Sequence, residues 1–92
     1  MSKEITQTFN FDKDEVFRFS KISGDHNRIH LDEEYASKTF FKKPIVHGVF
    51  VISKLTSLIA KEYENAILLD MKFRFLKPIY VGSKVKAVIK TD

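Results

Sequence analysis

A carboxylate and an imidazole, Asp25 and His30, stand five positions apart, directly after a glycine. Such a pair can hold one water molecule, remove a proton from it and return a proton elsewhere. Positioned acid–base groups of this kind typically raise a reaction rate by about 10²–10⁴-fold. A regular helix would turn the two side chains about 140° apart, and a strand would place them on opposite faces. The chain must therefore bend between them if they act together.

The same residues also have a purely structural interpretation. Asp25 could cap a helix end, and His30 could pack as a hydrogen-bonded core histidine. Asn27 lies between them and could hold the bend through bonds to the backbone, which is also what an ordinary Asx-turn does. We predict that the neighbouring His26 is exposed and has no role. The spacing alone leaves the catalytic and the structural interpretations open.

A second polar element, Pro44 to Gly48, directly precedes an apolar segment with helical periodicity. If Gly48 begins that helix, its free N–H and the helix dipole favour negative charge. A backbone donor aimed at a developing oxyanion contributes about 2.7–4 kcal/mol where it has been measured. Gly48 could instead merely ease a tight entry into the helix. His47 could line a pocket or cap the loop, and Thr56 could reach a ligand or bond back to the backbone.

The elements that must position these residues follow from apolar periodicity and from capping patterns. Asp12 and Glu15 have the spacing of a capping box, and Gly24 is typical of a helix end. The expected elements are a strand over 5–11, a helix from 13 to about 24, a loop over 24–31, a short helix over 32–38, a long helix over 46–63, and strands over 66–76 and 85–89. The long helix is apolar around most of its circumference, which predicts that it is buried. Three strands are few to wrap it, and they would leave open sheet edges.

Composition narrows the possible functions. A chain of 92 residues with 43% hydrophobic residues predicts one folded domain over 1–92. The absence of cysteine excludes disulfides and thiolate chemistry. The net charge of +4 comes from scattered lysines, so we expect no nucleic-acid partner. No apolar run is long enough for a membrane span, and the N-terminal residues carry no secretory signal, so we expect a cytoplasmic protein. Histidines at 26, 30 and 47 have no ligand spacing, and phosphate-loop and dinucleotide motifs are missing, so we predict neither metal nor cofactor.

Three stretches of the sequence together form a longer pattern. They are Phe19-Ser20-x-x-Ser23-Gly24-Asp25-x-Asn27-x-Ile29-His30-x-Asp32 continued by Tyr35-Ala36, then Phe41-x-x-Pro44-Ile45-Val46-His47-Gly48, and then Phe73-x-Phe75-x-x-Pro78-Ile79-x-x-Gly82. This pattern resembles the MaoC-like (R)-specific enoyl-CoA hydratases. The resemblance implies an α+β hotdog fold, in which an antiparallel sheet wraps a long central helix, usually in a dimer. It also implies hydration of trans-2-enoyl thioesters of coenzyme A or acyl-carrier protein to (R)-3-hydroxyacyl thioesters, and the reverse dehydration.

The resemblance also implies roles by position. Asp25 and His30 match the pair that activates water, and the Gly48 N–H matches the donor to the thioester carbonyl. Thr56 falls at a helix position where the family often has a hydroxyl that supports the site. From their own positions in the sequence, we also expect Asn27 and His47 to take part in substrate binding together with Thr56.

Two departures from the family pattern qualify this prediction. Arg28 stands where the family usually has proline, which could loosen the loop or reach a ligand phosphate. The expected C-terminal strands are also missing, so we expect either a C-terminally short domain or completion by another hotdog chain. The alternatives are a non-catalytic hotdog subunit, which binds acyl thioesters or completes a heterodimer, and a hotdog thioesterase.

Overall fold

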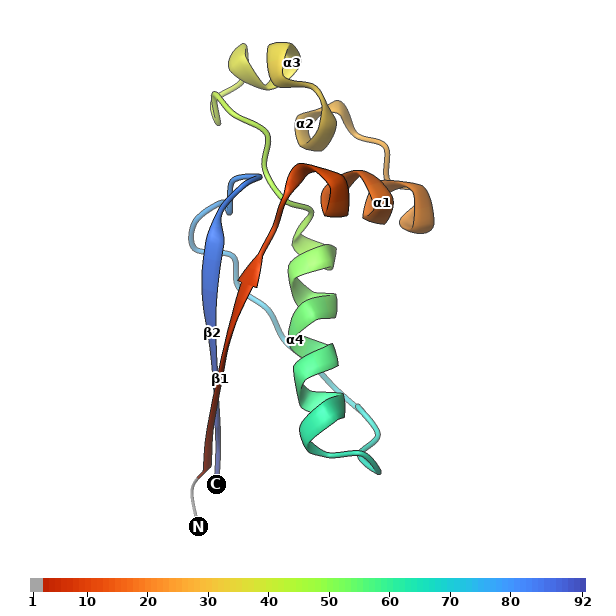
Figure 1. Ribbon diagram of the computed structural model, residues 1–92, viewed down its shortest axis with the longest axis vertical. Coiled ribbons are helices and arrows are strands. Elements are labelled where there is room, and N and C mark those ends of the chain that lie inside the picture. The colour runs from red at the N-terminus through yellow and green to blue at the C-terminus, as the bar shows by residue number, and fades with distance from the viewer. Residues whose placement is uncertain (1–2) are drawn as a thin grey trace.

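The computed structural model describes residues 3–92. Its elements are β1 (Lys3–Asn10), α1 (Lys13–Ser23), α2 (Arg28–Leu31), α3 (Glu33–Ser37), α4 (Gly48–Glu62) and β2 (Lys84–Thr91). The two strands form an antiparallel sheet beside α4, and the three shorter helices gather at the end where α4 begins (Figure 1). The loops around Asp25 and His47 therefore meet at one end of a molecule that measures 48 × 23 × 22 Å.

The sheet pairs the first strand with the last. Its register runs from Lys3 opposite Thr91 to Asn10 opposite Lys84. Alternate side chains are shielded on one face, where Ile5 lies opposite Ile89. This is the period of two that a half-buried strand produces. Both outer strands were therefore predicted correctly, to within two residues at their ends.

Helix α1 begins and ends as its sequence predicts. The Asp12 side chain accepts a hydrogen bond from the Glu15 N–H at 2.8 Å, and Gly24 adopts the left-handed conformation with φ 81°. Only half of the predicted capping box forms. The Glu15 carboxylate instead lies 3.6 Å from the ammonium group of Lys54 on α4. This ion pair connects α1 to the long helix.

The predicted loop over residues 24–31 is wrong in its second half, because Arg28–Leu31 form the short helix α2. Asn27 caps this helix, since its side-chain oxygen accepts the Ile29 N–H at 3.0 Å. A single helical turn of four residues is too short to show a hydrophobic period. Its capping residue was the only local signal.

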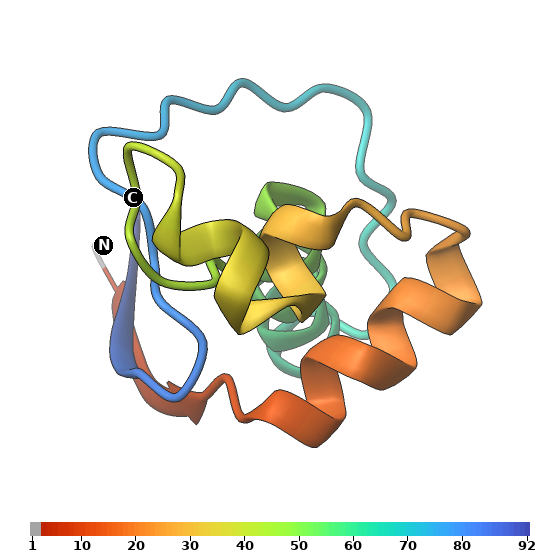
Figure 2. The ribbon, with the colours of Figure 1, turned by 90° about the horizontal axis from the view of Figure 1, so that it is seen from above.

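The strand predicted over 66–76 does not form. The segment between α4 and β2 is extended, and Figure 2 shows it arching around the outer side of the helix. Within residues 3–92, its only ladder contact is an isolated bridge between Ile45 and Tyr80. Alternating residues become a strand only when a neighbouring strand accepts their backbone hydrogen bonds, and none lies beside this segment. Ile67, Leu69 and Leu76 are consequently more than 80% exposed.

The core lies where the end of the sheet, α1 and the start of α4 meet. Its buried residues are Phe11, Val16, Val46 and Phe50. The Phe11 and Phe50 rings pack edge to face, with centroids 5.4 Å apart. Because this cluster holds the first turn of α4 against α1, it gives the polar loops above it a fixed base.

Candidate active site

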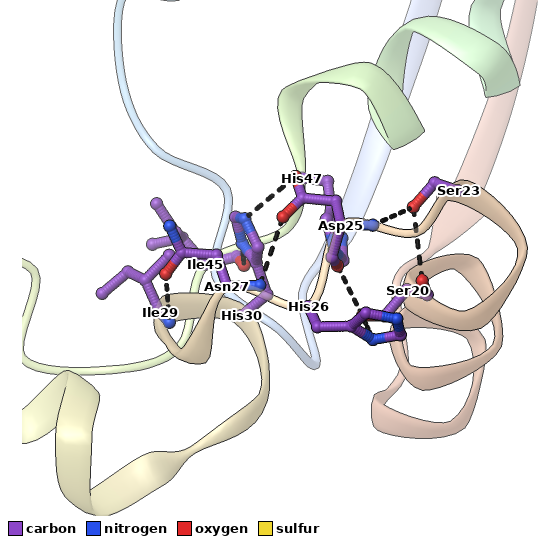
Figure 3. A network of polar contacts seen from close by, with 9 residues as sticks. All are labelled: Ser20, Ser23, Asp25, His26, Asn27, Ile29, His30, Ile45 and His47. Carbon is purple, nitrogen blue, oxygen red and sulfur yellow. Dashed lines mark hydrogen bonds and ion pairs between the residues drawn. The ribbon is translucent and has the colours of Figure 1, made fainter.

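The main chain at Asp25 is held by two buried side chains. The Ser20 hydroxyl donates to the Asp25 carbonyl oxygen at 2.5 Å, and His47 Nε2 donates to the same oxygen at 3.2 Å. Ser20 and His47 are each only 1% exposed. The loop is therefore tied both to α1 and to the residue that precedes α4 (Figure 3).

The two oxygens of the Asp25 carboxylate have different surroundings. Oδ1 accepts the Asn27 N–H at 3.2 Å in an Asx-turn. Oδ2 lies 4.0 Å from Nε2 of His30. The bend of the chain around Asn27 thus brings together two residues that neither a helix nor a strand could join.

The His30 ring is fixed through its other nitrogen. Nδ1 donates a hydrogen bond to the Ile45 carbonyl oxygen at 2.7 Å. A carbonyl accepts only, so the neutral ring carries its proton on Nδ1 and presents a lone pair at Nε2. That lone pair faces the Asp25 carboxylate.

The separation of 4.0 Å between Asp25 Oδ2 and His30 Nε2 is too long for a direct hydrogen bond. One water molecule about 2.8 Å from each atom would bridge them. The Asp25 side chain is 50% exposed and that of His30 11%, so the pair opens to solvent on the carboxylate side. This arrangement can orient a water molecule and exchange protons with it.

His47 is a buried neighbour of the pair. Its ring stacks on that of His30 with centroids 3.8 Å apart, and the Phe19 ring is inclined to it by 62° with centroids 5.0 Å apart. Burial lowers the pKa of His47, although its bond to the Asp25 carbonyl opposes that shift. The ring therefore stays neutral near pH 7. Its Nδ1 is buried, and no group among residues 3–92 hydrogen bonds to it.

Gly48 is the first residue of α4, which begins two residues later than the helix predicted over 46–63. Its N–H has no acceptor within the helix, and the side chain of the capping residue His47 does not bond to the helix end. Beside it lies an apolar cleft of about 340 Å³. The cleft is lined by Phe41, Ile45, Val46, Gly48, Val51, Phe75, Leu76, Lys77, Pro78 and Ile79. The tip of the Phe75 ring lies so close that a Cβ on Gly48 would be 2.8 Å from it.

Thr56 lies two helical turns beyond Gly48. Its hydroxyl donates back to the Ser53 carbonyl oxygen at 2.9 Å. Of the two possibilities given for Thr56, reaching a ligand or bonding to the backbone, the structure shows the second. The residue also lines a second cleft, of about 380 Å³, between α4 and the segment at Ala66 to Leu68. The structure thus does not bring Thr56 to the Asp25–His30 pair.

Arg28 is directed toward α3. Its guanidinium lies 3.0 Å from the Asp32 carboxylate and 4.7 Å from the centre of the Tyr35 ring. The Tyr35 N–H and the Arg28 guanidinium hold the pKa of Asp32 below its ordinary value. Arg28 occupies the first position of α2, where proline is also favoured. It therefore keeps the local geometry that a proline would give.

The structure also shows the positions of His26, in the loop after α1, and of Ser20, on α1 itself. His26 is exposed, as predicted, and its Nδ1 lies 3.3 Å from the Ser20 hydroxyl. Ser20 itself was missed as a site residue. Its position four residues after Val16 on the buried face of α1 was the available signal, because a buried hydroxyl needs a partner.

Known proteins resemble this chain in sequence and in fold. The sequence matches the family described as "MaoC like domain" over residues 1–92. The chain belongs to the MaoC-like domain family. Among solved structures, this MaoC-like domain is similar to an (R)-hydratase from A. caviae, with a TM-score of 0.89 and 31% identity over 95% of this chain and 67% of that one. It is also similar to an R-hydratase from Pseudomonas aeruginosa, with a TM-score of 0.87 and 29% identity over 96% and 58% of the two chains. These likenesses confirm the predicted hotdog fold.

Curated relatives have related names. The domain is 35% identical to an (R)-specific enoyl-CoA hydratase of Aeromonas caviae over 83% of this chain and 58% of the relative. It is 26% identical to a mitochondrial 3-hydroxyacyl-[acyl-carrier-protein] dehydratase of Arabidopsis thaliana over 94% and 52%. The chain thus spans little more than half the length of these relatives. Between residues 3 and 92, no helix has the length and apolar character to cross a membrane.

Proposed function

We propose that this MaoC-like domain catalyses the reversible hydration of trans-2-enoyl thioesters to (R)-3-hydroxyacyl thioesters. The observation that carries the proposal is the 4.0 Å separation of Asp25 Oδ2 and His30 Nε2, with His30 Nδ1 fixed on a backbone carbonyl. Relatives named as hydratases and dehydratases support it. A cytoplasmic location stays a prediction from the sequence.

In the proposed reaction, the Asp25–His30 pair binds the water that adds to the double bond. The pair removes one proton from this water as its oxygen bonds to the β-carbon of the enoyl group. The electron pair of the double bond shifts toward the thioester carbonyl, and the α-carbon then takes up a proton from the pair. Asp25 and His30 thus end the cycle in the protonation states in which they began.

Gly48 is proposed to stabilise the intermediate charge. As the double-bond electrons shift, the thioester carbonyl oxygen becomes negative. The Gly48 N–H has no acceptor within its own helix, and the helix dipole adds to the positive potential there. Because His47 precedes Gly48 and stacks on His30, the start of the helix lies next to the acid–base pair. The resemblance to the hydratase family supports this proposed role of the Gly48 N–H.

The apolar cleft beside Gly48 is proposed to hold the acyl group. Ten residues line it, and most of its surface is aliphatic or aromatic. Lys77 at its margin could meet a phosphate of the thiol carrier. Coenzyme A and acyl-carrier protein both present such a phosphate, so the proposal includes thioesters of either. Asn27 is proposed to act by holding the loop, through its cap on α2.

The domain is also proposed to act in an oligomer, either with a second copy or with another hotdog chain. Within residues 3–92, the sheet has two strands and both of its outer edges are unpaired. The extended segment after α4 exposes Ile67, Leu68, Leu69 and Leu76. Exposed apolar patches and open strand edges are typical of surfaces that another chain covers.

The test measures loss of enoyl absorbance with crotonyl thioesters of coenzyme A and of acyl-carrier protein, using folded protein of verified mass. Asp25→Asn should lower turnover by about 10²–10⁴-fold. Asp14→Asn removes another exposed carboxylate, in the first turn of α1, and should leave turnover unchanged. Equal turnover by Asp25→Asn and wild type would refute the role of the pair.

The same assay separates the alternatives. A wild-type chain that is inactive with both thioesters but binds them would support the non-catalytic hotdog subunit. Release of free thiol, followed with a thiol reagent, would support a thioesterase.

A further inference from the structure

We propose that Asp25, His30 and His47 form a binding site for a divalent transition-metal ion such as Zn²⁺. Each of these residues offers one ligand atom, and the three atoms all lie within 4.8 Å of one another. The residues come from the loop after α1, from α2 and from the position before α4. Their wide spacing along the chain is why the sequence predicted no metal site.

The donor set suits zinc in type and in number. Zinc accepts imidazole nitrogen and carboxylate oxygen at about 2.0–2.2 Å, commonly with three protein ligands and one open position. Tetrahedral ligands at that range are about 3.3 Å apart. To bind a zinc ion in this geometry, the three donor atoms would therefore have to move closer together by up to about 1.5 Å. The half-exposed Asp25 side chain has the freedom to make this movement, whereas His47 is packed.

In metal sites, groups that contact the ligand side chains hold these side chains in the orientation that the metal requires. Neighbouring groups hold His30 and His47 in the same way. The Ile45 carbonyl accepts the His30 Nδ1–H and so directs Nε2 toward the cluster. His47 is stacked on His30 and also packs against the Phe19 ring. A second observation is independent of this clustering. His47 is 1% exposed and carries a ring nitrogen that no group in residues 3–92 satisfies.

The bound ion would act as an inhibitor rather than a cofactor, and this consequence rests on the proposed function. The ion would use the Asp25 carboxylate and His30 Nε2 that hold the reacting water. Water activation by the pair and metal binding are then mutually exclusive. Binding itself requires no turnover, so it can be tested even if the hydratase proposal fails.

The chain offers a matched control, because it has three histidines and no cysteine. The test is calorimetric titration of Zn²⁺ into the full chain and into three variants. The wild type should bind one ion. His47→Gln and Asp25→Asn should each weaken binding at least 10-fold, since even outer-shell changes cost that much. His26→Gln, which changes the one histidine outside the cluster, should bind as the wild type does.

A second readout identifies the ligands directly. In ¹H–¹⁵N spectra of the histidine rings, Zn²⁺ should shift the signals of His30 and His47 and leave those of His26 in place. His47 is buried, so His47→Gln can fail to fold. In that case Asp25→Asn, which changes an exposed side chain, is compared with the wild type by calorimetry. Absence of binding by the wild type, unchanged binding by Asp25→Asn, or loss of binding by His26→Gln would each overturn the proposal.

Discussion

The imidazole rings of His30 and His47 stack with their centroids 3.8 Å apart and their planes 29° from parallel. Two imidazolium ions at this distance would repel each other strongly, so the pair favours at most one positive charge. Burial, and then the neighbouring His30, lower the pKa of His47, which makes His47 the neutral member.

Folding stability should depend on pH through His47. Above its ordinary pKa of 6.5, the ring is neutral in both the folded and the unfolded chain. Below that value the unfolded chain binds a proton that the folded chain does not, so the free energy of unfolding falls. The loss continues until the pH reaches the lowered folded pKa and amounts to about 1.4 kcal/mol per unit of pKa shift. Urea titrations between pH 7.5 and 5 should show a steeper fall for the wild type than for His47→Gln. Parallel curves would contradict this prediction.

Ser20→Ala should lower both stability and activity. The substitution removes the hydroxyl that donates to the Asp25 carbonyl, which then keeps only the bond from His47. A buried hydrogen bond typically contributes about 0.5–1.5 kcal/mol, so we expect a loss of about 1 kcal/mol in urea unfolding. Turnover should fall because the loop that carries Asp25 is less well fixed. The matched control is Ser37→Ala, whose exposed hydroxyl bonds to the Glu34 carbonyl and should change stability by less than about 0.5 kcal/mol.

Gly48→Ala should be sensitive to Phe75. The new Cβ would lie 2.8 Å from the tip of the Phe75 ring, which must move. We expect a cost of about 0.5–1 kcal/mol that disappears when Phe75 is also changed to alanine, which gives a positive coupling in a double-mutant cycle. Strictly additive free energies would show that the two residues are not in contact.

Arg28→Pro should be tolerated and should modestly stabilise the domain. Arg28 is the first residue of α2, where proline loses no helical hydrogen bond. The preceding Asn27 has φ −58° and ψ 129°, the extended conformation that a following proline requires. The expected gain is about 0.4–1 kcal/mol, reduced by the loss of the exposed Arg28–Asp32 pair. Ile29→Pro is the control, because it removes the N–H that Asn27 caps, and it should destabilise.

The sequence predicted those elements whose signals are local. Asp12 and Gly24 mark the ends of α1, and the apolar run after Gly48 marks α4, because capping and periodicity act within a few residues. The aperiodic segment between Asp25 and His30 allows a bend, but the spacing alone left open whether the two side chains meet, and only the family resemblance implied that they act as a pair. The sequence did not predict the form of this bend. The bend depends on the helix cap at Asn27, which a single side chain makes and which no pattern of residues signals.

Other features depend on contacts that the sequence does not display. The segment from Ala66 to Leu76 alternates like a strand, but strand pairing requires a neighbour that residues 3–92 do not supply. The double anchoring of the Asp25 carbonyl by Ser20 and His47 joins positions up to 22 residues apart in sequence. Proximity of this kind arises only when α1 and α4 pack on the shared core.

The pairing of β1 with β2 has a consequence for how the domain is made. The register places Lys3 opposite Thr91, so the sheet closes a loop that includes nearly the whole described chain. Contacts between such distant residues slow folding, because chain entropy is lost before the contacts form. During synthesis, β1 leaves the ribosome before β2, so Ile5 and Phe9 have no partner strand until β2 follows. The sheet can therefore form only after β2 has emerged, and until then β1 is an open edge at which nascent chains can aggregate.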